Sequence, residues 1–197
     1  MHDVPQLGDA LPLVATGPAW LAAALADLDS VHADHLHCER KAAQSALSLI
    51  RSYPERGDLV TAMARLAHDE TRHVVQVAQL MARRGQPASY DHGDDYAAAL
   101  RAEIRVREPD RLIDRLLVFA IIEGRSAERL ALLAVALDDP KSRALYADLA
   151  DAEVRHRDTF LALARDAAPA TWRARSAELA AREAEILKLR IPTARIH

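Results

Sequence analysis

Residues 64–85 read ARLAHDETRHVVQVAQLMARRG, a helix-like stretch in which Glu70 is followed three positions later by His73. Side chains three residues apart lie on the same face of an α-helix, so this pair can bind one metal ion from a single helix. The same spacing recurs further along the chain in Glu153 and His156. The repeat predicts two helices that each present a carboxylate and an imidazole.

Each pair is preceded by another glutamate at a similar distance. Glu39 stands 31 residues before Glu70, and Glu123 stands 30 residues before Glu153. In an antiparallel helical hairpin such spacings correspond to roughly 20 Å of rise along one helix and back along the next. The glutamates of each hairpin therefore return to the same level. Four Glu and two His, one set per hairpin, form the ligand set of a carboxylate-bridged di-metal site.

The composition of the chain and the positions of its Gly and Pro residues predict an all-α protein. Ala and Leu dominate, aromatic residues make up 4%, and most Gly and Pro fall between periodic segments. We expect helices at 18–52, 58–84, 94–107, 109–137, 140–167 and 170–189, with a loop over 85–93. Two hairpins joined by one long crossover give a ferritin-like four-helix bundle. We expect a single domain over 1–197 with its core at about 18–167, plus a short N-terminal segment, a crossover helix and a C-terminal helix.

The donor set favours iron or manganese over zinc, because hard carboxylates outnumber imidazoles. In the expected arrangement each metal takes one glutamate and one histidine, and two glutamates bridge; the residues are Glu39 with His73, Glu123 with His156, and the bridging Glu70 and Glu153. Six ligands shared by two metals leave positions for dioxygen or substrate. Two ferrous ions held in this way can activate dioxygen for attack on a C–H bond.

Other readings of these residues stay open. Glu123 follows the apolar run LLVFAII, where an unpaired charge would cost several kcal/mol. A metal supplies the partner, and so would a buried ion pair with Arg125 or Arg129. His35 lies one turn before Glu39 and either hydrogen-bonds to it or is an ordinary histidine.

Charge and cysteine content narrow the function classes. The net charge is −3, which does not indicate a nucleic-acid binder, although 23 of the 26 basic residues are Arg. The only cysteine, Cys38, excludes an intramolecular disulfide and an iron–sulfur cluster held by cysteines of this chain alone. No secretory signal or membrane span is recognisable, so we expect a cytoplasmic protein.

Five stretches resemble the MiaE-type tRNA hydroxylases, and the resemblance spans about residues 11–167. They are PAWLAAALADLD (18–29), DHLHCERKAAQSALSLI (34–50), ARLAHDETRHVVQVAQLMARRG (64–85), REPDRLIDRLLVFAIIEGRSAERLALLA (107–134) and DAEVRHRDTFLALA (151–164). The stretches HCERKAA and IEGRSAERL are the most specific. Two local differences from the family pattern stand out: His35 and His37 occupy positions where the family tends to have small residues, and HDETRH replaces a REELRH-like stretch. Neither difference removes a metal ligand, so they bear on substrate preference and not on the iron site.

The resemblance implies a ferritin-like enzyme with two iron ions that uses dioxygen to hydroxylate the isopentenyl side chain of a modified adenosine beside the tRNA anticodon. It assigns the iron ligands to Glu39, Glu70, His73, Glu123, Glu153 and His156. Electrons must come from a separate reductase or ferredoxin, because the chain has one cysteine and no dinucleotide-binding glycine motif. We expect a monomer or small homo-oligomer.

A tRNA enzyme needs a basic surface, and the arginines around the crossover are the candidates for phosphate contacts: Arg83, Arg84, Arg101, Arg105 and Arg107. Ordinary solvated helix ends are the alternative reading of these residues. The competing functions are a di-iron or di-manganese peroxidase or catalase, an iron-handling protein and a metal-free bundle.

Overall fold

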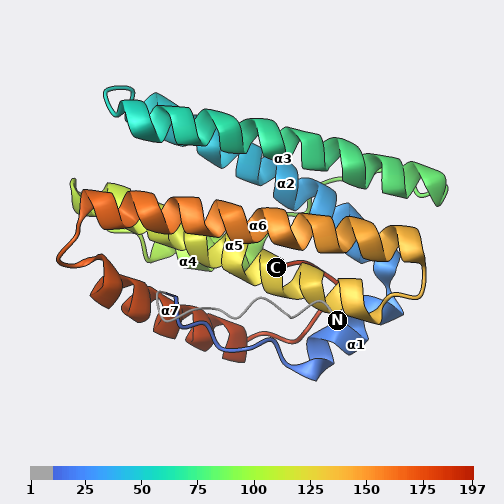
Figure 1. Ribbon diagram of the computed structural model, residues 1–197. Helices are drawn as coiled ribbons and strands as arrows, with labels where there is room; N and C mark the ends of the chain where they lie inside the picture. The colour runs from blue at the N-terminus through green and yellow to red at the C-terminus, as the bar shows by residue number, and fades with distance from the viewer. Residues whose placement is uncertain (1–10) are drawn as a thin grey trace. The chain divides into compact units, whose positions relative to one another are not determined.

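The computed structural model describes residues 11–197 (Figure 1). Within this range the chain forms helices and no strand. The helices are α1 (Pro18–Ala26), α2 (Leu28–Ser52), α3 (Gly57–Arg83), α4 (Asp95–Ala102), α5 (Asp110–Ala136), α6 (Pro140–Ala167) and α7 (Trp172–Lys188). None of these helices is long and apolar enough to cross a membrane.

Two helix boundaries correct the sequence-based expectation. The continuous helix expected over 18–52 is interrupted at Asp27, whose carboxylate accepts a hydrogen bond from the backbone N–H of Ser30 and caps α2 (3.1 Å). The crossover helix α4 ends at Ala102 instead of about 107. The backbone N–H of Arg105 donates to Asp114 (2.9 Å), which takes this segment out of the helix.

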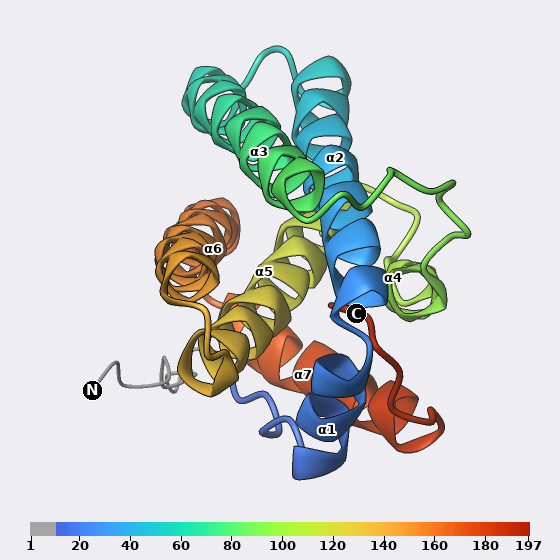
Figure 2. The same ribbon diagram turned by 90° about the vertical axis from the view of Figure 1, so that its right-hand side faces the viewer.

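The chain divides into two compact units. Of the described residues, the α2–α3 unit contains 22–92 and 193–196, and the α5–α6 unit contains 11–21, 93–192 and 197. In the first unit α2 and α3 lie side by side as a hairpin (Figure 2). In the second unit α5 pairs with α6 along its length, and α4 and α7 pack near α5 (Figure 1). The two hairpins predicted from the spacing are therefore present.

A buried polar network fastens the elements of the α5–α6 unit around Arg125. Its side chain is fully buried and donates to Glu183 of α7 (2.9 Å), to the hydroxyl of Thr16 (2.9 Å) and to Glu128. Glu183 also accepts a hydrogen bond from the hydroxyl of Tyr96 in α4 (2.9 Å). The cost of burying these charges is offset because each is paired and hydrogen-bonded.

Gly124 is a helical position where neighbouring side chains leave little room for a larger residue. A Cβ at this position would lie 3.3 Å from the side chain of Leu11 and 3.4 Å from those of Leu13 and Arg157. The N-terminal segment therefore crosses α5 in close contact, directly beside Glu123.

Candidate metal centre

The α2–α3 unit brings three of the predicted ligands together. Glu39 lies on α2, and Glu70 and His73 lie on α3, one turn apart. Nδ1 of His73 is 3.2 Å from Oε2 of Glu70 and 3.5 Å from Oε2 of Glu39. All three side chains are buried, and their ligand atoms lie within 4.8 Å of one another. The spacing of 31 residues thus places both glutamates at one level of the hairpin.

Glu39 is ionised despite its burial because His35 lies beside it. Burial by itself raises the pKa of this carboxyl. The charge and hydrogen bond of His35, assisted by His73, outweigh that effect and hold the pKa well below its ordinary value. Nε2 of His35 is 2.5 Å from Oε1 of Glu39, and His35 is itself buried. His35 therefore orients one oxygen of Glu39 and leaves the other directed towards His73.

The α5–α6 unit contains the second set. Glu123 lies on α5, and Glu153 and His156 lie on α6; each is at most 5% exposed. Nδ1 of His156 is 3.5 Å from Oε2 of Glu153. The ligand atoms of the three residues lie within 4.8 Å of one another. Each unit thus carries one buried Glu, Glu, His triad.

The chemistry of these triads fits a divalent metal ion. In each unit two carboxylates lie close together in a buried environment, where their like charges oppose simultaneous ionisation. A cation between them removes this conflict. The donors are carboxylate oxygens with one imidazole per triad, a combination that suits iron or manganese.

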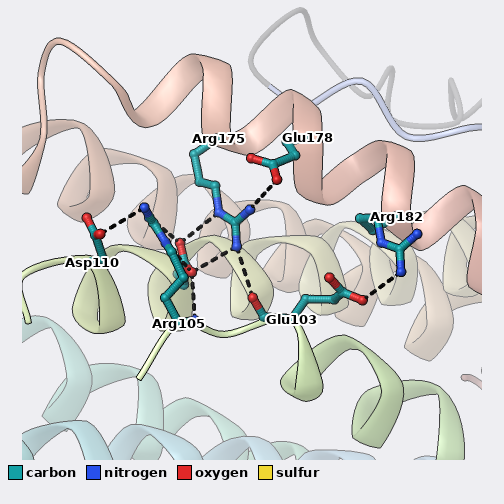
Figure 3. Close-up of polar contacts among 7 residues, drawn as sticks. Glu103, Arg105, Asp110, Arg175, Glu178 and Arg182 are labelled. Atoms are coloured by element: carbon teal, nitrogen blue, oxygen red, sulfur yellow. Dashed lines mark hydrogen bonds and ion pairs between the residues drawn. The ribbon is translucent and has the colours of Figure 1, made fainter. Parts of the chain in front are cut away.

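The arginines proposed from sequence to contact tRNA lie in different surroundings. Arg83, Arg101 and Arg107 are exposed, and Nε of Arg84 lies 3.8 Å from Asp29. Arg105 is bound to carboxylates (Figure 3): its Nε and Nη2 donate to Asp114 (2.8 and 2.7 Å). Its Nη1 also lies 3.0 Å from Asp110. The charge of Arg105 is therefore compensated within the α5–α6 unit.

Asp114 is a buried carboxylate that sequence reasoning did not single out. Arg175 of α7 donates to it through Nε and Nη2 (2.9 Å each), and Nη2 also reaches the carbonyl of Glu103 (Figure 3). Burial raises the pKa of Asp114, but the hydrogen bonds from Arg105 and Arg175 prevail and lower it to about 2. This cluster fastens α7 and the segment after α4 to α5.

In the α2–α3 unit, Asp34 is a buried carboxylate that anchors a distant segment of the chain, as Asp114 does in the α5–α6 unit. It is buried one turn before Cys38 and accepts hydrogen bonds from Nε of Arg195 (2.8 Å) and the backbone N–H of Ile196 (2.7 Å). The C-terminal residues 193–196 are thereby held on α2. Because 161 residues separate Asp34 from Arg195, no local pattern could have revealed this pair.

A family profile described as tRNA-(MS[2]IO[6]A)-hydroxylase (MiaE) matches residues 8–197. The chain belongs to the MiaE family. A Pseudomonas putida protein named tRNA 2-(methylsulfanyl)-N(6)-isopentenyladenosine(37) hydroxylase is 42% identical over 189 residues, which cover 95% of this chain and 91% of that protein. A Salmonella typhimurium protein of the same name is 31% identical, over 76% of this chain and 73% of its own length.

A solved structure extends the comparison to the fold. Protein 43 with aldehyde deformylating oxygenase activity from Synechococcus matches this MiaE-family chain with a TM-score of 0.88 and 37% identity, over 94% of both chains. The prediction of an all-α, ferritin-like fold is confirmed. So is the resemblance to the MiaE-type tRNA hydroxylases.

Proposed function

We propose that this chain hydroxylates the isopentenyl side chain of 2-methylthio-N6-isopentenyladenosine at position 37 of tRNA, beside the anticodon. The observation that carries the proposal is the pair of buried Glu, Glu, His triads in a member of the MiaE family. The names of the Pseudomonas and Salmonella relatives support the choice of substrate.

We propose that the two triads together hold two iron ions. Glu39, Glu70 and His73 of the α2–α3 unit and Glu123, Glu153 and His156 of the α5–α6 unit would hold these ions. His35 acts on Glu39 through its hydrogen bond and does not bind metal. The side chains of both triads are buried, which limits the access of water to them.

The iron pair supplies the activation of dioxygen when it is bound. In the overall reaction one oxygen atom enters a C–H bond of the prenyl group as a hydroxyl, and the other leaves as water. This balance requires two electrons and two protons from outside the chain. We therefore propose a separate ferredoxin or reductase as the partner, a cytoplasmic location shared with tRNA, and a monomer or small homo-oligomer.

We propose that arginines around the crossover contact the tRNA phosphates, but that not all five do so equally. Arg83, Arg84, Arg101 and Arg107 are available for phosphate contacts, whereas Arg105 is held by Asp114. Contacts of arginine with phosphates position a nucleic acid without selecting its sequence. A base in the anticodon loop is already unpaired, so presenting it to the enzyme costs little.

The function is tested by mass spectrometry of tRNA nucleosides from cells with and without the gene, and from reactions of the iron-loaded protein with an electron donor. We expect a gain of one oxygen atom on the isopentenyl nucleoside only where the protein is present. Unchanged nucleosides in both settings, with iron bound and an active donor, would refute the proposal.

A second activity is suggested by the Synechococcus structure, whose title reports aldehyde deformylating oxygenase activity. The same reaction mixture supplied with a long-chain aldehyde tests it. We expect no loss of aldehyde above the rate with protein-free iron. Efficient conversion of the aldehyde together with inert tRNA would replace the hydroxylase proposal.

A further inference from the structure

One aromatic side chain differs from all the others in its exposure. The chain has eight aromatic residues, and seven of them are at most 8% exposed. Tyr90, in the loop between α3 and α4, is 90% exposed. Unlike the other seven aromatic rings, the ring of Tyr90 does not contribute to the packed interior.

The loop around Tyr90 is tied to α2 on both sides of the ring. Nε2 of His37 donates to the carbonyl oxygen of Ser89 (2.9 Å), and Nη2 of Arg40 donates to the carboxylate of Asp91 (2.6 Å). The residues before and after Tyr90 are therefore both anchored. The exposed ring of Tyr90 therefore projects from a segment of backbone that is hydrogen-bonded to α2 on both sides.

The start of the loop is anchored in the same way. Nε2 of Gln86 donates to the backbone carbonyl of Asp29 (2.6 Å), and Oε1 of Gln86 lies 3.1 Å from Nδ1 of His32. Residues 86–91 have no helical or turn structure and run along α2 from Asp29 towards Arg40. The Asp91 carboxylate faces α2, whereas the side chain of Tyr90 is exposed to solvent.

The surroundings of the ring carry an excess of positive charge. Arg40 and Lys41 lie on α2 beside Asp91, with Nζ of Lys41 3.8 Å from its carboxylate. At the start of the loop Arg84 lies near Asp29. These three cations exceed the two carboxylates by one charge.

We propose that Tyr90 is a stacking platform for an unpaired base of the tRNA anticodon loop, with the cations around it contacting the adjoining phosphates. This inference rests on the proposed function. Unpaired bases stack on exposed aromatic side chains, and basic residues follow the backbone beside them. A stable protein partner would bury about 800 Å² on this side around an apolar centre, whereas here a single ring stands among polar and charged residues.

The experiment measures the affinity of the iron-loaded protein for a synthetic anticodon stem-loop RNA by fluorescence anisotropy. We compare wild type with Tyr90→Ala, which removes the ring, and Tyr90→Phe, which keeps it. The matched control is Val75→Ala, which shortens another exposed apolar side chain of the α2–α3 unit. We expect Tyr90→Ala to weaken binding about 10-fold, and Tyr90→Phe and Val75→Ala to change it by less than about 2-fold.

Three outcomes would overturn the inference. One is equal binding by wild type and Tyr90→Ala. Another is an equal loss in Tyr90→Ala and Tyr90→Phe, which would assign the effect to the hydroxyl. The third is a slower electron transfer from the donor protein with unchanged RNA affinity, which would make this loop the donor's docking site.

A further variant separates stacking on this residue from a folding defect. Tyr90→Trp places an indole at the same point, and we expect its fluorescence to be quenched by the stem-loop but not by a base-paired RNA of equal charge. Equal quenching by both RNAs would overturn the stacking. If wild type bound no stem-loop RNA at all, the proposed function would fail first.

Discussion

At the scale of single residues, the ligand assignment makes the most direct prediction. Replacing Glu123 by Ala removes one buried carboxylate of the α5–α6 triad, and we expect most of the bound iron to be lost. The fold survives, because the carboxylate leaves together with the positive charge that balanced it. Iron content by elemental analysis and helicity by circular dichroism check both statements. The control is Glu185→Ala, an exposed glutamate of α7. Full iron content in Glu123→Ala would remove this residue from the ligand set.

His35 is predicted to affect iron binding without being a ligand. Its short hydrogen bond fixes one oxygen of Glu39. Groups that orient metal ligands typically change metal affinity by about 10- to 100-fold when they are removed. We expect His35→Ala to release iron to a competing chelator at about 10-fold lower chelator concentration, and His35→Gln, which keeps a donor, to recover part of the loss. Equal retention of iron by wild type and His35→Ala would contradict this role.

At the scale of helices, the cluster around Asp114 predicts an acid-sensitive contact between α7 and α5. The pKa of Asp114 is lowered from 3.8 to about 2, so this carboxylate stabilises the folded state above roughly pH 4. The contribution, about 2 kcal/mol at neutral pH, is lost as the pH falls through about 2. We expect Asp114→Asn to unfold at lower urea concentration than wild type at pH 7. The difference should shrink as the pH approaches 2, and a difference that stayed constant with pH would argue against the ionised cluster.

The helices were largely predictable from sequence, and the departures have local causes. Periodicity located α4 and α6, and in the structure the carboxylates of Asp94 and Asp139 cap these two helices. Asp27 was missed as a boundary because the apolar pattern continues on both sides of it.

The site was predictable to the extent that its geometry is local. The pair Glu70 and His73 lies within one turn, and the hairpin length places Glu39 at their level, so rise per residue was enough. The anchoring pairs were not predictable, because the partners of Asp34 and Asp114 lie as far as 161 and 61 residues away. Tyr90 gave no signal either, since its exposure depends on how the loop follows α2.

At the scale of the whole molecule, each unit contributes three of the six proposed ligands. Neither triad alone matches the ligand set of a di-metal site, for which four glutamates and two histidines are needed. We therefore propose that residues 1–197 function as one domain when iron is bound. On this proposal, iron that binds the folded chain and not the unfolded one would stabilise the fold by about 2.7 kcal/mol when free iron is at 100 times its dissociation constant.

This proposal predicts that a ligand removed from one unit changes the stability of the other. We expect iron to slow hydrogen exchange of the amides in α3 of wild type, and we expect Glu123→Ala, a change in α5, to abolish that protection although Glu70 and His73 are intact. The mass-spectrometric exchange of α3 peptides with and without iron measures this. Glu185→Ala, also in the α5–α6 unit, should retain the protection. If α3 of Glu123→Ala were still protected by iron as in wild type, each triad would bind its own metal, and the two units would be separate in function.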